Sequence, residues 1–391
     1  MPLLVVRYQG GGNAGHTLVV DGIIYKLHQI PSGIISPKAF NLLGEKMYVD
    51  PVKLMQEIQS LREKGIGVSP DNIGISANAH MTLEYHVADD KKDLHRPGKN
   101  ESTGSGNKQT AKDKYFRTGM RFVEFLDGQS MEAILNKVGS VDWIRENHGS
   151  VVAFVKQYDF AREYLVPFLV SQHDVLKVHG YTHTIFEGAQ AIMLDVDKGQ
   201  YPGITSSNPV IVPHKTDVIV GMLKLYLSSV GTAERAFMTK MQDSDLEYTL
   251  QDQWGEVGTT TGLRRELGWF DAVAARYAVE TTDTDYLVGT RGDSLETLHH
   301  MGAPLFIATA YKINGKTYDR WDPSFFNRFT LADVEPVLQE MPTWNIFSSD
   351  GVLSPNAQHY IDTIQQLLDK EFVLLGTGPS REDILVRKDI L

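Results

Sequence analysis

Residues 3–17 read LLVVRYQGGGNAGHT, and this stretch decides what kind of fold the rest of the chain must complete. Its first half is an apolar, β-rich run that passes directly into a loop, residues 10–16, holding four glycines, an asparagine and a histidine. Strand character resumes at residues 18–20, so the pattern predicts a strand, a glycine loop and a second strand. Because ligands favour the ends of strands in open sheets, we expect a binding site at this loop.

The residue types in this loop suit phosphate chemistry. Glycines let the backbone approach a ligand closely, Asn13 can donate to a phosphate oxygen, and His16 can supply a proton near neutral pH. The alternative interpretation is a tight turn with an incidental histidine.

Helices and strands alternate further along the chain. Asp50 and Pro51 open a helical apolar stripe that ends before Gly65, with an N-cap residue and a proline at the first helical position. Residues 354–368 repeat this pattern just before a strand-like run at residues 372–375. The alternation predicts an α/β protein. We find no repeat and no linker, so we expect one domain over residues 1–391.

Composition excludes several classes of function. The chain has 391 residues, 42% of them hydrophobic, and no cysteine, which excludes disulfides, cysteine-bound metals and thiol nucleophiles. A net charge of −11 argues against sequence-independent binding of nucleic acid. No apolar run of about 18 residues predicts a membrane span. We expect a cytoplasmic protein without nucleic-acid or membrane partners.

Several other segments are candidates for binding. Residues 89–114 are strongly polar and predict a long loop, in which Ser102, Thr103 and the following glycines and cations suit a phosphate nest or simply a solvated loop. Gln190 ends a predicted strand, where its amide could read a purine edge or cap a turn. Arg265 follows three threonines and could clamp a carboxylate, or be half of a surface basic pair. Residues 376–381 follow a strand and suit a nucleotide loop or an ordinary turn.

In this order, the segments resemble the adenylosuccinate synthetase family along nearly the whole chain. The resemblance rests on VVRYQGG and NAGHT, then LH and IPSG, FEGAQ, TSSN, GWFD and TGP. It implies a P-loop-type α/β fold with a central, mostly parallel sheet flanked by helices. It also implies a Mg²⁺-dependent ligase that phosphorylates the 6-oxygen of a purine nucleoside monophosphate, using ATP or GTP, and then displaces the phosphate with the amine of L-aspartate.

The resemblance also implies roles for single residues. His16 corresponds to the acid that stabilises phosphoryl transfer, Gln190 to the contact with the base at the catalytic centre, and the carbonyl of Gly15 to a magnesium ligand. Monophosphate contacts are implied for Asn13, Ser102, Thr103, Thr205 and, from a neighbouring subunit of a homodimer, Arg117. Contacts to the aspartate carboxylate are implied for Thr260, Thr261 and Arg265, and contacts to the triphosphate's base for Asp293, Gly376 and Gly378.

One departure from the family is an absence. Family members begin with a further strand and a glycine-rich phosphate loop, whereas this sequence starts at the second strand. We expect a mis-assigned start or a fragment, because chemistry should fail without that loop. The alternative is a non-catalytic, nucleotide-binding relative.

A second departure concerns the substrate. Leu263 stands where the family carries an arginine that reaches the ribose 2′-hydroxyl, and leucine cannot form that hydrogen bond. Together with residues 230–235, which replace the usual glycine-proline stretch, it resembles the bacteriophage branch, which joins aspartate to dGMP. This favours dGMP, with IMP, the substrate of ordinary adenylosuccinate synthetase, as the alternative. Asp293 favours GTP, whereas some members of the phage branch are expected to use ATP or dATP, so the choice of triphosphate stays open.

Overall fold

The chain forms two compact units. The computed structural model describes residues 2–93, 103–178, 180–210, 212, 214–229, 239–258, 262, 264–326, 328–329, 333–347 and 352–390. The first unit comprises Met1–Thr17, Tyr25–Asp197 and Ile204–Pro213, and the second comprises Leu18–Ile24, Lys198–Gly203 and His214–Leu391. The single domain expected from the sequence stays a prediction.

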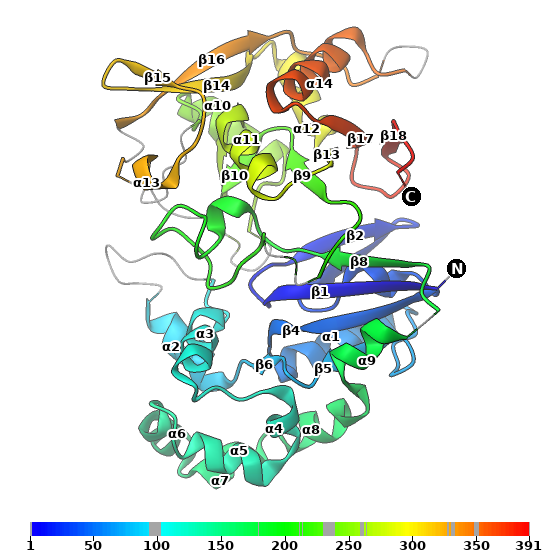
Figure 1. Cartoon of the computed structure of the whole chain (residues 1–391), viewed down its shortest axis with the longest axis vertical. Helices are drawn as coiled ribbons and strands as arrows, with labels where there is room; N and C mark the ends of the chain where they lie inside the picture. Colours follow the sequence, from blue (N-terminus) through cyan, green and yellow to red (C-terminus); the bar gives the residue numbers. More distant parts are fainter. Residues whose placement is uncertain are drawn as a thin grey trace. The chain divides into compact units, whose positions relative to one another are not determined.

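The first unit is built on a parallel sheet in which β1 lies between β4 and β8 (Figure 1). The strand order is β7-β5-β4-β1-β8, with β6 also pairing with β4. The strands are β1 (Leu3–Gly11), β4 (Ala39–Val49), β5 (Ile73–Ser76), β6 (His80–Met81), β7 (Leu169–Val170) and β8 (His183–Glu187). Eight of the nine β1 residues are buried, as expected of a strand with neighbours on both sides and cover on both faces.

Helices complete the first unit. They are α1 (Pro51–Glu63), α2 (Glu84–Asp93), α3 (Asn107–Phe116), α4 (Phe122–Leu126), α5 (Gly128–Leu135), α6 (Val141–His148), α7 (Val151–Lys156), α8 (Asp159–Leu165) and α9 (Gln172–Lys177), with short 3-10 turns η1 (Ser32–Ile35), η2 (Val166–Phe168) and η3 (Ile192–Leu194). The predicted helix after Asp50 is confirmed, because the Asp50 carboxylate accepts from the backbone nitrogens of Val52 and Lys53 at the start of α1.

The long loop predicted for residues 89–114 is wrong at both ends, where α2 and α3 are helical. These helices are held together by buried polar groups. The side chain of His86 lies 3.1 Å from Asp113, and the carboxylate of Asp90 accepts from Gly106 N at 2.9 Å. A polar composition therefore concealed a packed pair of helices. Residues 94–102, including Ser102, lie outside the described residues.

The second unit holds a sheet in the order β18-β17-β13-β9, in which only β18 is antiparallel to its neighbour. Its strands are β9 (Val220–Lys224), β13 (Tyr286–Thr290), β17 (Glu371–Gly376) and β18 (Ile384–Val386). Further sheets contain β12 (Phe270–Asp271), β14 (Leu305–Ile313), β15 (Lys316–Tyr318) and β16 (Glu335–Met341), and the pair β10 (Leu227–Ser229) and β11 (Glu266–Gly268). The predicted strand at residues 372–375 is confirmed as part of β17.

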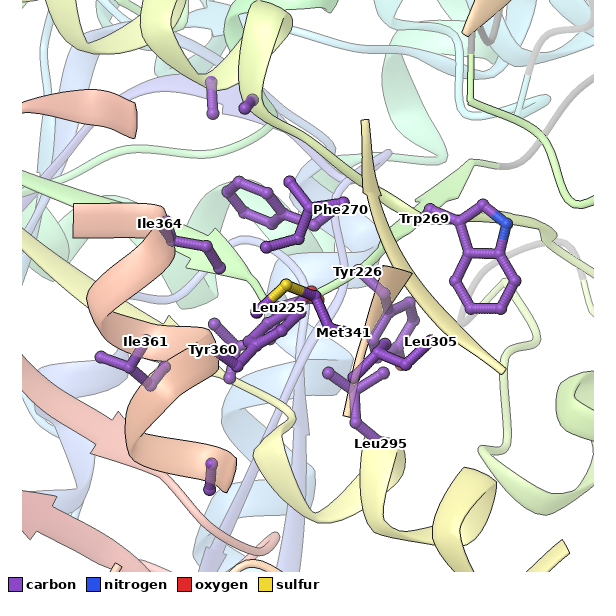
Figure 2. Close-up of a cluster of buried hydrophobic side chains, with 14 of the residues drawn as sticks. Leu225, Tyr226, Trp269, Phe270, Leu295, Leu305, Met341, Tyr360, Ile361 and Ile364 are labelled. Carbon is purple, nitrogen blue, oxygen red and sulfur yellow. The ribbon is translucent and has the colours of Figure 1, made fainter. Parts of the chain in front are cut away.

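Helices of the second unit enclose an apolar core. They are α10 (Ser244–Gln253), α11 (Ala272–Thr281), α12 (Gly292–Met301), α13 (Pro323–Phe326) and α14 (Pro355–Leu368). The predicted helix near the C-terminus is confirmed as α14, with Ser354 as its N-cap. Figure 2 shows Tyr360 of α14 beside Leu225, and its hydroxyl donates to the Leu225 carbonyl at 2.8 Å. No described helix is long and apolar enough to cross a membrane.

A hairpin of β2 (His16–Val20) and β3 (Ile23–Leu27) follows the glycine loop. Its tip, Leu18–Ile24, groups with the second unit, where the Arg381 amide donates to Val19 O at 3.3 Å. Within the described part of the chain, β8 pairs only with β1 and β9 only with β13. Among the described strands, each of these two sheets therefore ends at a parallel strand.

A buried carboxyl group makes stability depend on pH. Asp271 caps α11 through Val273 N and Ala274 N, and it accepts from the Tyr311 hydroxyl at 2.5 Å. Burial raises its pKa from 3.8 to about 6, so the native protein binds this proton more tightly than the unfolded chain. We expect the free energy of unfolding to fall by at most about 3 kcal/mol as the pH rises between these two pKa values.

Asp271→Asn keeps an acceptor at the helix start but cannot ionise, so it should lack this fall. Urea unfolding of both proteins at a series of pH values measures the difference. Identical pH profiles would contradict the prediction.

Candidate active site

The glycine loop passes tightly against neighbouring elements of the first unit. A Cβ atom added at Gly11 would lie 2.5 Å from the Tyr48 carbonyl and 2.8 Å from the Asn107 amide, so only glycine fits there. A Cβ at Gly10 would lie 3.8 Å from Gln190 Oε1. The loop is therefore in direct contact with the end of β4, the start of α3 and the segment after β8.

Asn13 and Asn107 join the loop to α3. The Asn107 amide nitrogen donates to Asn13 Oδ1 at 2.6 Å, which leaves the Asn13 amide nitrogen as the donor on that side chain. Asn107 is the first residue of α3, where helix N–H groups favour anions. The sequence reasoning did not identify Asn107, although its place directly after the glycine-rich run 102–106 was a usable signal.

Gln190 and Thr205 also come together. Gln190 has a positive φ of 69°, and its Nε2 donates to Thr205 Oγ1 at 3.4 Å. Its Oε1 is buried and has no hydrogen-bond partner among the described residues. Since buried polar atoms are normally paired, this oxygen is an acceptor available to a ligand. The structure thus brings Gly10, Asn13, Gln190 and Thr205 to one place around the loop.

Thr103 lies just before the start of α3, and Arg117 directly follows its end. Thr103 Oγ1 is 2.8 Å from Ser105 Oγ, just before the helix. Arg117 is exposed and follows the last residue of α3, about 15 Å along the helix axis from Asn107. Its neighbours Tyr115 and Phe116 are 71% and 73% exposed. Arg117 is therefore displayed on the surface, away from the Asn13 end of the helix.

His16 is partly buried beside Arg7 and Glu187. Its Nδ1 lies 3.2 Å from Arg7 Nη1, and its Nε2 lies 3.9 Å from Glu187 Oε1. Burial, with the positive charge of Arg7, lowers the pKa of His16 from 6.5 to about 4. The imidazole is therefore neutral at pH 7. A neutral ring donates a hydrogen bond from its single N–H, and the role of His16 as a proton source stays a prediction.

The described residues do not by themselves form a magnesium site. Among them no three His, Asp or Glu side chains are grouped to hold a metal ion. Mg²⁺ needs about six oxygen ligands, usually including a carboxylate, and the predicted ligand Gly15 offers one carbonyl oxygen.

Arg265 belongs to a charge cluster in the second unit. The Glu256 carboxylate, 2% exposed, accepts from Lys224 Nζ at 2.7 Å, Tyr226 OH at 2.5 Å and Arg265 Nη1 at 2.7 Å. Burial opposes ionisation of Glu256, but these donors outweigh it and lower the pKa to about 2. The buried Glu256 carboxylate thereby holds the Arg265 guanidinium in place. Thr260, Thr261 and Leu263 lie outside the residues that the structure describes.

Asp293, Gly376 and Gly378 lie at the carboxyl ends of β13 and β17, which are adjacent and parallel. A Cβ at Gly292 would lie 3.2 Å from Gly376 O, so the start of α12 touches the end of β17. A Cβ at Gly378 would lie 2.5 Å from the carboxylate of Asp383, whose Oδ2 accepts from Ser380 N at 2.8 Å. Sequence reasoning did not identify Asp383. Strand ends of this kind are where α/β sheets bind ligands.

Comparisons with known proteins agree with this geometry. Residues 3–385 match the profile of the adenylosuccinate synthetase family. Adenylosuccinate synthetase of Listeria monocytogenes is 35% identical over 412 aligned residues, covering 99% of this chain and 92% of the relative. The enzyme of Bacillus cytotoxicus is 34% identical, covering 99% and 93%.

Solved structures give the same result for the fold. The fully ligated adenylosuccinate synthetase from Plasmodium falciparum superposes with a TM-score of 0.85 at 25% identity, covering 99% of this chain and 94% of that one. The cyanophage S-2L succinoaminodeoxyadenylate synthetase, bound to dGMP and dATP, gives 0.56 at 17% identity, covering 98% and 87%. At that identity the second likeness concerns the fold alone. The expected α/β fold with a central, mostly parallel sheet flanked by helices is confirmed.

The Glu256 cluster predicts a large effect of a conservative substitution. Glu256→Gln keeps the shape of the side chain but removes the charge that compensates Lys224 and Arg265. We expect a loss of about 3 kcal/mol in the free energy of unfolding at neutral pH. Because the pKa of Glu256 is lowered from 4.5 to about 2, its stabilisation is present above pH 4.5 and is lost as the pH falls toward 2.

Urea unfolding at a series of pH values measures this effect, and the variant should lack the acid-dependent part. The matched control is Glu266→Gln, which breaks a partly exposed pair with Lys240 (2.6 Å) and should cost about 1 kcal/mol or less. Equal losses for the two variants would show that burial of the Glu256 cluster has no special effect.

Proposed function

The chain belongs to the adenylosuccinate synthetase family of carbon–nitrogen ligases, and we propose that its own substrates are IMP, L-aspartate and GTP. The observation that carries this proposal is the similarity to ordinary bacterial adenylosuccinate synthetases along nearly the whole chain. The cluster of Gly10, Asn13, Gln190 and Thr205 supports it, since it offers amide and hydroxyl donors for a phosphate beside an unpaired acceptor for a base.

The proposed reaction has two steps. The γ-phosphoryl group moves from the triphosphate to the 6-oxygen of the purine, and the aspartate amine then attacks carbon 6 as the C6–O bond breaks and phosphate leaves. Asn13 and Thr205 hold the 5′-phosphate, and Gln190 orients the base so that carbon 6 faces the incoming groups. His16 donates a hydrogen bond from its neutral ring to an oxygen that gains charge.

In this proposal, residues of the second unit bind the other two substrates, aspartate and the triphosphate. Arg265, held by Glu256, binds the aspartate carboxylate, and Asp293 accepts hydrogen bonds from the guanine of GTP beside Gly376 and Gly378. Mg²⁺ is proposed to accompany the triphosphate, with the carbonyl of Gly15 as a protein ligand.

A second candidate substrate is dGMP, with ATP or GTP as phosphoryl donor. The observation that favours it is Leu263, which cannot hydrogen-bond a ribose 2′-hydroxyl and so tolerates a deoxy sugar. This is the activity of the bacteriophage branch.

Incubation of the protein with Mg²⁺, aspartate, ATP or GTP, and equal amounts of IMP and dGMP tests both candidates. Mass spectrometry should detect the succinylated product of IMP as the main product. If succinylated deoxyguanylate predominates instead, the preferred substrate is dGMP and the reaction is that of the phage branch. Absence of any product would favour a non-catalytic nucleotide-binding protein.

Leu263→Arg separates the two candidates further. In a dGMP enzyme it should raise the IMP to dGMP ratio of kcat/KM by about tenfold or more, because a hydrogen bond to the 2′-hydroxyl is gained. In an IMP enzyme, where Leu263 is compensated elsewhere, we expect little change.

We also propose that the chain forms a homodimer in which Arg117 reaches the partner's monophosphate. The exposed Tyr115 and Phe116 beside Arg117 offer apolar area for that contact. Phe116→Asp should therefore weaken dimerisation about thirtyfold, since a buried aromatic anchor contributes about 2 kcal/mol. Sedimentation velocity over a range of protein concentrations measures the shift.

The control is Phe160→Asp, which changes an aromatic residue on α8 that is 66% exposed but not adjacent to Arg117. It should leave the dimer unchanged. A wild-type protein that stays monomeric, or equal effects of both substitutions, would argue against this interface.

A further inference from the structure

A buried arginine lies directly behind the histidine of the glycine loop. Arg7, on β1, is 1% exposed. Its Nη1 lies 3.2 Å from His16 Nδ1, and its Nη2 donates to the Ala14 carbonyl at 3.0 Å. The strand that precedes the loop therefore holds it at two points, one of them the imidazole ring itself.

The chemistry of the two groups determines where the proton of His16 sits. A guanidinium has only N–H donors, so His16 Nδ1 must be the acceptor in this contact and cannot carry a hydrogen. A neutral imidazole has one N–H, which is then on Nε2. The Ala14 carbonyl lies within reach of the ring and could accept from Nδ1 in the other tautomer, but it also accepts from Arg7 Nη2, so Arg7 competes for both groups.

The Nε2 atom is left without a hydrogen-bond partner. It is buried, it has no such partner among the described residues, and at 3.9 Å the Glu187 carboxylate is too far for a hydrogen bond. Because an unpaired buried donor is costly, this N–H is suited to meet an acceptor that is brought to it.

Two carboxylates compensate the charge of Arg7 through space. Glu187 lies opposite Arg7 in the register of β1 and β8, and its Oε2 accepts from Ser32 N at 2.8 Å. Glu57 accepts from the backbone nitrogens of residues 28–30. Burial lowers the pKa of Arg7, whereas the charges of Glu187 and Glu57 raise it. Arginine is not deprotonated in proteins, so Arg7 remains a donor.

We propose that Arg7 is a positioning residue that fixes His16 in the Nε2–H tautomer and so leaves it one role, that of a hydrogen-bond donor from Nε2. The oxygen that receives this hydrogen bond rests on the proposed function, whereas the tautomer does not. Arg7→Met removes both contacts and frees the Ala14 carbonyl, so Nδ1–H becomes favourable. Arg7→Lys keeps a cationic donor that can still reach Nδ1.

Nitrogen NMR of the full-length protein, labelled with ¹⁵N-histidine, reads the tautomer directly. The signals of His16, one of thirteen histidines, are assigned by their loss in His16→Gln. The wild type should show an unprotonated Nδ1 and a protonated Nε2. Arg7→Met should shift population to Nδ1–H, and Arg7→Lys should restore the wild-type pattern.

Asn41→Ala is the matched control for the loss of a buried polar side chain. Asn41 is fully buried on the adjacent strand β4 and hydrogen-bonds to Asn72 O at 3.1 Å, away from the loop. It should lower stability without changing the His16 tautomer. A wild-type spectrum with a protonated Nδ1 would overturn the proposal, and this outcome does not depend on any variant folding. An unchanged tautomer in Arg7→Met would also overturn it.

Kinetics separate this inference from the proposed function. In Arg7→Met, kcat for the ligase reaction should fall about 10²-fold with KM for the nucleotides little changed, because a misplaced catalytic group affects the chemical step. An altered tautomer with unchanged kcat would refute the positioning role. A wild-type protein without ligase activity would refute the proposed function and leave the tautomer result intact.

Discussion

The burial of the Arg7 cation within a parallel sheet, on a strand between β4 and β8, is the constraint on which the first unit depends. A charge at that depth must be compensated and hydrogen-bonded. Glu187 and Glu57 provide the charge, and the His16 ring and the Ala14 carbonyl accept from Nη1 and Nη2, whereas Nε has no hydrogen-bond partner among the described residues. The same two carboxylates accept hydrogen bonds from backbone amides of residues 28–30 and 32, so the groups that compensate Arg7 also hold the segment after β3.

The second unit uses the same principle with the signs reversed. Glu256 is the buried anion, and Lys224, Tyr226 and Arg265 are its donors. Such clusters are weak evidence for stability, because desolvation offsets much of the attraction. Their value here is geometric. Each cluster holds one side chain, His16 in the first unit and Arg265 in the second, in a defined orientation.

Local sequence patterns were enough to predict much of the secondary structure. The alternating character of residues 3–20, the caps at Asp50 and Ser354, and the strand at residues 372–375 each depend on near neighbours, and each was predictable. The helices α2 and α3 were not. Their buried groups, such as Asp90, pair with partners distant in sequence, and polar composition alone resembles a solvated loop.

The sequence by itself determined the α/β class, the glycine loop and the family motifs, because backbone propensity and residue identity are local properties. Tertiary structure decided which of those residues meet. It placed Asn107 against Asn13, brought Gln190 to Thr205, and joined Glu256 to Arg265. It also set the neutral state of His16, since a pKa depends on burial and on charges that only folding brings near.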